Sequence, residues 1–339
     1  MYPRISDIFD DLFGIEIQLP LYTFGLMVAV AFLVAAWLLR KELDRKYASG
    51  IIGSVRVKDE KAPKPTRGGK KSARMVDVSP GYVAGTATFI ALISGFLGAR
   101  LFHILENLPS FFRDPFGMLF ASAGLTFLGG LIVAGLSVAY YVRKKGLSIP
   151  AFADAVAPGL MIAYGIGRIG CYLAGDGDWG ICSNLANKPG WIPGFLWSET
   201  FPRNVMGPGQ TPTDVIEYTR LQMAESGMDA SVCASATGVY PTMLYEFAMA
   251  ALLFFTLWKL RAHRWAAGWL FGLYLVFAGA ERFLIEQIRV NNVGEFLGMT
   301  VTQAEVISVA MIVLGGIIMV RTMQKRDTLD QPKPAAIDA

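Results

Sequence analysis

Cysteine, histidine and charged residues are scarce in this sequence. The 339 residues include three cysteines and two histidines, with no CxxC pair and no Cys/His cluster. This pattern excludes a disulfide scaffold and a zinc site, so we expect neither a metal nor another cofactor. Charged residues make up 17% of the chain, against roughly 25% in soluble domains. Hydrophobic residues reach 53% and the mean hydropathy is +0.43, which indicates a polytopic membrane protein.

Apolar runs divide the chain into seven predicted membrane-spanning helices. Each run approaches the length that a bilayer requires, which is about 20 residues. The runs cover residues 21–39, 81–105, 117–142, 151–174, 240–258, 266–288 and 301–320. The predicted fold is therefore an all-α integral membrane protein of seven transmembrane helices, with a long extracytoplasmic loop, 175–239, between the fourth and the fifth.

The distribution of Lys and Arg predicts the orientation. Connections rich in these residues are 40–74, 143–145, 259–264 and the segment from 321. Seven spans place all four on one side, which the positive-inside rule assigns to the cytoplasm. The N-terminus then lies outside and the C-terminus in the cytoplasm.

The remaining segments follow from this topology. Residues 1–20 read as an extracytoplasmic interfacial segment without a cleaved signal peptide, and a helix is expected near 213–225. Residues 40–80 form the basic cytoplasmic loop, and the six further spans occupy 81–320. We expect residues 40–74 to be largely disordered and solvated; contact with anionic lipid or nucleic acid is the alternative. The cytoplasmic tail, 321–339, is also expected to be disordered.

Arg168 lies near the end of the fourth run, among six glycines and the acidic pair Asp176 and Asp178. An arginine in hydrocarbon costs about 2.5–3.5 kcal/mol on insertion scales, and is usually retained for a cavity, a partner or an anion. Its rigid fork of donors suits phosphate oxygens. We predict a phospholipid headgroup site here. The alternative is a helix end held by an Arg–Asp pair.

Further ionisable residues lie near the outer ends of the predicted spans. They are Arg100, His103, Glu246, Glu281, Arg282, Glu286 and Arg289. The spacing of Arg282, Glu286 and Arg289 puts them on one helix face, which should point into the bundle. The excess of arginine favours an anionic ligand such as a lipid phosphate. The alternative is a web of structural Arg–Glu pairs.

Several short motifs, in this order, carry a family resemblance. They are residues 24–27 (FGLM), 98–100 (GAR), 127–132 (FLGGLI), 167–180 (GRIGCYLAGDGDWG), 240–246 (YPTMLYE), 282–286 (RFLIE) and the region of Gln303. Together they resemble the prolipoprotein diacylglyceryl transferase family, seven-span enzymes of the bacterial inner membrane. The resemblance covers about residues 19–318.

The resemblance implies an enzyme that moves the diacylglyceryl group of phosphatidylglycerol onto the lipobox cysteine of a preprolipoprotein, with release of glycerol phosphate. The implied partners are phosphatidylglycerol, preprolipoprotein signal peptides and the membrane, without nucleic acid. The implied location is the bacterial cytoplasmic membrane.

The resemblance also implies roles for individual residues. Arg168 and Arg282 match arginines assigned to the phosphate, where cations stabilise the charge that develops on the leaving group. Asp176 occupies the position of a family glutamate and Gly180 matches a glycine after a shift of one residue. Arg100 and Glu286 match as supporting residues. Together with Arg168, Gly180 and Tyr245 they are the predicted phospholipid-binding residues.

The chain departs from the family pattern at several positions. They are Phe24, Leu128, Cys171, Ala174 and Ala278, where the family has tyrosine, histidine, asparagine, asparagine and tyrosine. Leucine cannot accept a proton, so the base that activates the thiol differs, is unnecessary or is missing. His103, one helical turn past Arg100, is a replacement candidate because an imidazole titrates near neutral pH.

Two other functions compete with the transferase. The first is a divergent family member that binds phospholipid but modifies a different acceptor or is inactive. The second is a transporter or channel, which the lack of an inverted repeat disfavours.

The cysteines carry one more prediction. Cys182 and Cys233 fall in the outer loop, where a disulfide can persist. Cys171 reads as a small packing residue.

Overall fold

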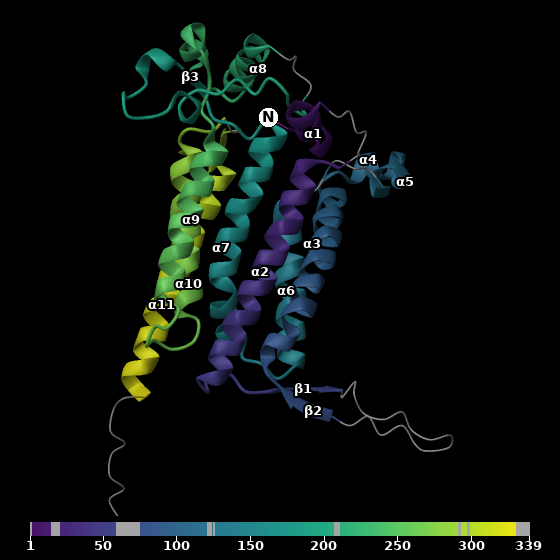
Figure 1. Cartoon of the computed structure of the whole chain (residues 1–339), viewed down its shortest axis with the longest axis vertical. Coiled ribbons are helices and arrows are strands. Elements are labelled where there is room, and N and C mark those ends of the chain that lie inside the picture. Colours follow the sequence, from purple (N-terminus) through teal and green to yellow (C-terminus); the bar gives the residue numbers. More distant parts are fainter. Residues whose placement is uncertain are drawn as a thin grey trace, which may run out of the picture. The chain divides into compact units, whose positions relative to one another are not determined.

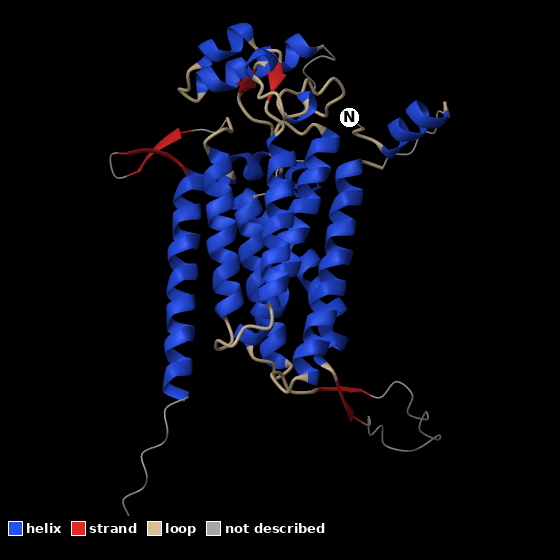
Figure 2. Cartoon of the chain, turned by 60° about the vertical axis from the view of Figure 1, so that its left-hand side comes forward, coloured by secondary structure: helices blue, strands red, loops and turns tan. Residues whose placement is uncertain are grey.

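The computed structural model describes residues 2–14, 21–58, 75–120, 124, 126–206, 211–290, 293–296 and 299–329. The middle of the predicted basic loop, 59–74, and the end of the tail, 330–339, lie outside the described residues. Helices make up most of the described chain, and its strands are short (Figure 2).

Among the described residues, six helical segments are long and apolar enough to cross a membrane. They are α2 (Thr23–Ala48), η1 with α3 (Pro80–Glu106), α6 (Phe127–Lys144), α7 (Ile149–Ala174), α9 (Thr242–Leu260) and the Gln303–Lys325 part of α11 (Gln303–Leu329). The predicted sixth span also forms a helix, α10 (Trp269–Glu286), but three charged residues interrupt its apolar sequence. An all-α membrane protein is confirmed, whereas the count of seven spans stays a prediction.

Helix boundaries differ from the predicted spans at three places. α2 continues past residue 39 to Ala48, and the buried Lys46 Nζ lies 3.8 Å from Asp154 Oδ2, so its last turns are held by ion pairing. The third span begins only at Phe127, because α5 (Pro115–Phe120) is a separate helix. α11 continues to Leu329, so the predicted disordered tail begins as helix.

Short strands and helices occupy the connections. The remaining elements are α1 (Ile5–Phe13), β1 (Val55–Lys58), β2 (Met75–Val78), α4 (Leu108–Arg113), β3 (Cys182–Ser183), η2 (Leu185–Asn187), η3 (Gly194–Leu196), α8 (Pro212–Glu225), η4 (Ala230–Ser235), β4 (Gly238–Val239), β5 (Val293–Phe296) and β6 (Met299–Thr302). The Pro80–Glu106 span consists of η1 (Pro80–Val83) followed by α3 (Ala84–Glu106). β1 pairs with β2, β3 with β4 and β5 with β6, all antiparallel.

The β1–β2 pair corrects the expectation that residues 40–74 are largely disordered. Valines alternate with polar residues in both strands, which is the period of a half-buried strand. Val55 is buried and belongs to an apolar cluster with Leu43 and Phe152. The described start of the predicted loop is therefore anchored to a core.

The chain divides into two compact units, of which residues 35–156 form one. In this unit α3 and α6 lie against each other at glycines: a Cβ on Gly98 would lie 2.7 Å from the Gly129 carbonyl oxygen. Small residues at membrane helix contacts let backbones approach closely.

Residues 1–34 and 157–339 form the other unit, in which α10 packs against α11. Figure 1 shows these two helices side by side next to α9. Gly272 and Gly315 face each other, since a Cβ on Gly315 would lie 2.5 Å from the Gly272 carbonyl oxygen. This close approach fixes the position of α10, which carries several of the charged residues.

The segment 175–239 caps one end of α9 and includes α8, the helix predicted near 213–225 (Figure 1). Its core stacks Trp179 on Phe201, with ring centroids 4.9 Å apart. The predicted disulfide between Cys182 and Cys233 is confirmed and closes the segment beside β3. The predicted N-terminal segment forms α1, and the Arg203 guanidinium donates two hydrogen bonds to Asp11 on it, at 2.9 and 3.1 Å.

Candidate functional site

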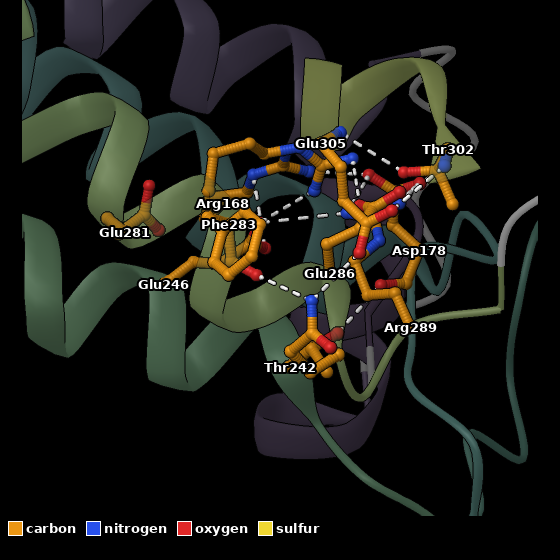
Figure 3. Close-up of polar contacts among 12 residues, drawn as sticks. Arg168, Asp178, Thr242, Glu246, Glu281, Phe283, Glu286, Arg289, Thr302 and Glu305 are labelled. Carbon is orange, nitrogen blue, oxygen red and sulfur yellow. Dashed lines mark hydrogen bonds and ion pairs between the residues drawn. The ribbon is translucent and has the colours of Figure 1, made fainter. Parts of the chain in front are cut away.

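Charged side chains from three helices and two loops gather in the unit formed by residues 1–34 and 157–339. We call them the arginine–carboxylate cluster; its members are Arg168 on α7, Asp178 after α7, Glu246 on α9, Arg282 and Glu286 on α10, and Arg289 after α10. Figure 3 shows most of them converging on one another. Sequence spacing within one helix could not predict this meeting of separate segments.

Asp178 bridges two guanidinium groups. Arg168 Nη1 donates to its Oδ2 at 2.5 Å, and Arg289 Nη2 donates to its Oδ1 at 2.7 Å. Burial alone would raise the pKa of Asp178, but the charges of Arg289 and Arg168 outweigh that effect and hold the pKa below its usual range. Asp178 is therefore a carboxylate held between two cations.

Glu246 lies at the buried side of the cluster. Its oxygens are 3.2 Å from Arg168 Nε, 3.6 Å from Arg289 Nη1 and 3.8 Å from Arg282 Nη1. The Tyr164 hydroxyl also donates to Glu246, at 2.9 Å. One fully buried carboxylate thus holds three guanidinium groups together, because a buried charge needs opposite charges and hydrogen bonds around it.

Arg282 is the most exposed arginine of the cluster, with 25% of its side chain accessible against 16% for Arg168 and 9% for Arg289. Its Nη2 lies 2.8 Å from Glu286 Oε2. Its Nη1 makes no hydrogen bond within the described part of the chain. The predicted shared face of Arg282 and Glu286 is confirmed by this pair, whereas Arg289 follows the end of α10.

The cluster contains equal numbers of arginines and carboxylates, whereas the sequence analysis predicted an excess of arginine. Arg168, Arg282 and Arg289 face Asp178, Glu246 and Glu286. The sequence interpretation underweighted Asp178, which the glycine turn brings back to Arg168. In this conformation the cluster is a web of ion pairs, as the alternative interpretation described.

Asp176 has different surroundings from Asp178, although only one residue separates them. Its carboxylate lies within 4.8 Å of the Cys171 sulfur and accepts from the Asp178 backbone N–H at 3.3 Å. Burial and the neighbouring charge of Asp178 raise the pKa of Asp176. Gly175 and Gly177 have φ of 61° and 89°, the backbone region that favours glycine, and they shape the turn that carries both carboxylates.

A metal ion is disfavoured at this turn. Cys171, Asp176 and Asp178 offer ligand atoms within 4.8 Å of one another. However, both oxygens of Asp178 already accept hydrogen bonds from guanidinium groups. A cation would have to compete with two arginines, so we assign no metal here.

Gly180 lies where three backbone segments meet. Its N–H donates to the Tyr240 carbonyl at 2.8 Å, and a Cβ at this position would lie 2.5 Å from the Ile288 carbonyl oxygen. The neighbouring Ile181 N–H donates to the same Ile288 oxygen at 2.9 Å. Gly180 therefore positions Asp178 and Arg289 relative to each other, while its predicted contact with lipid stays a prediction.

Tyr245, a predicted phospholipid ligand, turns its hydroxyl towards the outer segment and donates to the Leu196 carbonyl. It is the sequence neighbour of Glu246 but is not a member of the cluster. Its ring lines an apolar pocket between α9 and residues 191–197.

Arg100 and His103 belong to the unit of residues 35–156. Arg100 Nη1 donates to the carbonyls of Gly124, at 3.0 Å, and Met118, at 3.3 Å. The His103 imidazole lies against Gly124 and is 3.5 Å from the Asn107 side-chain nitrogen. Both residues hold the connection before α6, and their predicted roles at the phospholipid stay predictions.

The residues predicted to act in catalysis or lipid binding did not include Asp178, Glu246, Arg289 or Tyr164. Asp178 had been noted beside Arg168, and Glu246 and Arg289 among the charged residues near the outer ends of the spans. A usable signal existed for Tyr164, which precedes Arg168 by one helical turn; the Arg168 guanidinium lies 5.1 Å from its ring centroid. Glu246 ends a motif on another helix, and only the fold brings it to Arg168.

A sequence profile of the prolipoprotein diacylglyceryl transferase family matches residues 66–321. The chain belongs to this family. The resemblance carried by the sequence motifs is therefore confirmed. Three of the relatives illustrate it, each named phosphatidylglycerol–prolipoprotein diacylglyceryl transferase.

The relative from Corynebacterium efficiens is 27% identical over 328 residues, which cover 94% of this chain and 82% of the relative. The relative from Bifidobacterium adolescentis is 29% identical over 253 residues, which cover 71% of this chain and 67% of the relative. The relative from Rhodococcus jostii is 30% identical over 232 residues, which cover 66% of this chain and 58% of the relative. These transferases span much of the same length as this chain.

Proposed function

We propose that this protein transfers the diacylglyceryl group of phosphatidylglycerol to the lipobox cysteine of preprolipoproteins in the bacterial cytoplasmic membrane. Family membership and the names of the relatives support the reaction. The observation that carries the site assignment is the pair of guanidinium groups, from Arg168 and Arg289, that reach one partly exposed carboxylate.

The phosphate takes the place of the Asp178 carboxylate. The Asp178 side chain is 36% exposed, so it can turn outward, and its two arginines then face an anion of similar shape. Arg282, whose side chain is the most exposed of the three arginines, completes the contacts. Arginine forks match phosphate oxygens well, which supports this exchange.

The chemical step is a displacement at the glycerol carbon. The acceptor thiol, with an ordinary pKa of about 8.5, loses its proton to a base and attacks as thiolate. A carbon–sulfur bond forms while the carbon–oxygen bond breaks, and glycerol phosphate leaves with the electron pair. The arginines stabilise the charge that develops on the phosphate oxygens.

Asp176 is the base in this proposal. Its raised pKa distinguishes it from Asp178, which two cations keep ionised, and among the described residues no arginine is ion-paired with Asp176. Carboxylates whose environments separate their pKa values divide acid–base roles in this way. His103 remains the competing candidate from the sequence.

Seven crossings orient the site in this proposal. α10 is the sixth crossing and α11 the seventh, the segment 175–239 faces the extracytoplasmic side, the N-terminus is outside and the C-terminus is in the cytoplasm. The disulfide between Cys182 and Cys233 supports an oxidising compartment for that segment.

The test is transfer of radiolabelled diacylglyceryl from phosphatidylglycerol to a lipobox peptide in proteoliposomes. Arg168→Ala should abolish transfer, while Arg220→Ala, which breaks an exposed pair on α8, should leave it unchanged. Phosphatidylglycerol that still binds wild-type protein without transfer would mean that the lipid site serves another acceptor or none.

A further inference from the structure

An apolar pocket lies beside the arginine–carboxylate cluster. It has a volume of about 500 Å³, is open on one side, and is lined by residues from 191–197, by Tyr240, by the first two turns of α9 and by Ile288. This volume lies within the range of ligand pockets, about 300–1,000 Å³. The arginine–carboxylate cluster does not use it.

Two of the four aromatic residues that line the pocket turn their polar atoms towards the loop backbone. The Tyr245 hydroxyl donates to the Leu196 carbonyl, and Trp197 Nε1 donates to the Asn184 carbonyl at 3.0 Å. The surface that remains towards the pocket is apolar. A peptide backbone bound there would need hydrogen-bond partners, whereas a hydrocarbon chain needs none.

The α9 wall of the pocket continues along the helix as an apolar stripe. Leu244 and Ala248 line the pocket, and Leu252 and Phe255 follow at the spacing of one helix face. Leu252 and Phe255 are exposed by 67% and 65% on a helix that can span a membrane. The pocket is therefore continuous with a face that hydrocarbon covers.

The other side of the pocket adjoins the cluster. Tyr245 precedes Glu246 on α9, and Ile288 precedes Arg289, so consecutive residues face the pocket and the cluster. The Ile288 carbonyl also accepts from Ile181, three residues after Asp178. A lipid whose phosphate lies at the arginines can thus place a chain in the pocket.

We propose that this pocket is an acyl-chain site, which holds one chain of the phospholipid whose headgroup binds the arginine–carboxylate cluster. The inference rests on the proposed lipid site and adds the surface that selects the donor by its chains. Trp191, which is 83% exposed, forms the outer wall.

The first experiment uses phosphatidylglycerol with a photoreactive diazirine in one chain, bound to the full-length protein without acceptor peptide. Crosslinks should map to α9 at Leu244 and Ala248. Ala248→Trp, which fills the pocket, should lower this crosslinking about tenfold, the effect of roughly two methylenes left unburied. Leu260→Trp, at the far end of α9, is the matched control.

The second experiment measures transfer with donors of two chain lengths. Ala248→Trp should raise the KM for dioleoyl phosphatidylglycerol about tenfold and change that for the dihexanoyl lipid less than about twofold. Trp191→Ala changes an exposed position and should not disturb folding. It should lower the preference of the enzyme for the dioleoyl lipid over the dihexanoyl lipid.

Equal losses for both lipids, or crosslinks that ignore Ala248→Trp, would overturn the acyl-chain site. A rise only in the KM for the lipobox peptide would assign the pocket to the acceptor instead. Crosslinking needs no transfer, so a labelled pocket in a protein without transferase activity would reject the proposed reaction and keep the pocket.

Discussion

At the scale of single residues, the opposite surroundings of Asp176 and Asp178 are the feature with most consequence. Asp178 lies between Arg168 and Arg289, whereas the Asp176 carboxylate lies within 4.8 Å of the Cys171 sulfur. Two carboxylates of one turn therefore differ in charge state over a range of pH. Their separation makes two predictions possible.

The first prediction concerns Asp176 as base. Only the ionised form accepts a proton, so kcat/KM should rise with pH through the Asp176 pKa, which lies above its usual value of 3.8. Asp176→Asn should remove this rise of kcat/KM with pH and lower kcat about 10²–10⁴-fold. Asp176→Glu should restore part of the rate. If kcat/KM still rises with pH in Asp176→Asn but no longer does so in His103→Ala, the base is His103.

The second prediction concerns stability. The pKa of Asp178 is lowered in the fold, so its stabilisation is present above the ordinary value of 3.8 and is lost as pH falls through the folded pKa. Acidification through this range should lower the Tm of the purified protein. Asp178→Asn should weaken the dependence of Tm on pH, which thermal scans in detergent at several pH values would measure. The same dependence of Tm on pH in Asp178→Asn and wild type would contradict a stabilising role of the Asp178 carboxylate.

The third prediction separates the charge of Arg168 from its geometry. Lysine keeps the charge but cannot contact Asp178 and Glu246 at once, as the Arg168 fork does. Arg168→Lys should lower kcat about 10²–10³-fold, the usual effect of losing one donor to a developing charge. Retention of the wild-type rate would show that charge alone suffices.

At the scale of elements, close backbone contact between α10 and α11 positions Arg282. A Cβ added at Gly315 would meet the Gly272 carbonyl, whereas a Cβ added at the next residue, Gly316, would meet no atom within 4 Å. Gly315→Ala should therefore destabilise the protein by about 1–3 kcal/mol and lower its activity. Gly316→Ala is the control and should do neither; equal Tm values for the two variants would contradict close packing.

At the scale of the whole molecule, the proposed topology predicts which surfaces a reagent reaches. A cysteine introduced at the exposed Asn187 should react with a membrane-impermeant maleimide in intact spheroplasts. A cysteine at the exposed Ser49 should react only after permeabilisation, because it follows the cytoplasmic end of α2. The reverse pattern would invert the topology.

The sequence alone determined what local chemistry decides. Hydrophobic length located the membrane helices, and glycine-rich residues 167–180 identified Arg168 and the family. The two outer cysteines predicted a disulfide because only one pairing was available in that segment. Helix propensity and hydrophobic composition are properties of short stretches of sequence, so they can be read without knowledge of the fold.

The tertiary structure decided which charges meet. Glu246 and Arg289 come from separate segments, and no spacing in the sequence relates them to Arg168. Asp178 follows Arg168 in the same motif, but only the fold showed that Asp178, and not Asp176, pairs with that arginine. Burial makes each charge depend on partners that only helix packing supplies. For the same reason the pocket beside Tyr245 was invisible in the sequence: a cavity is a property of the surfaces that several elements leave between them.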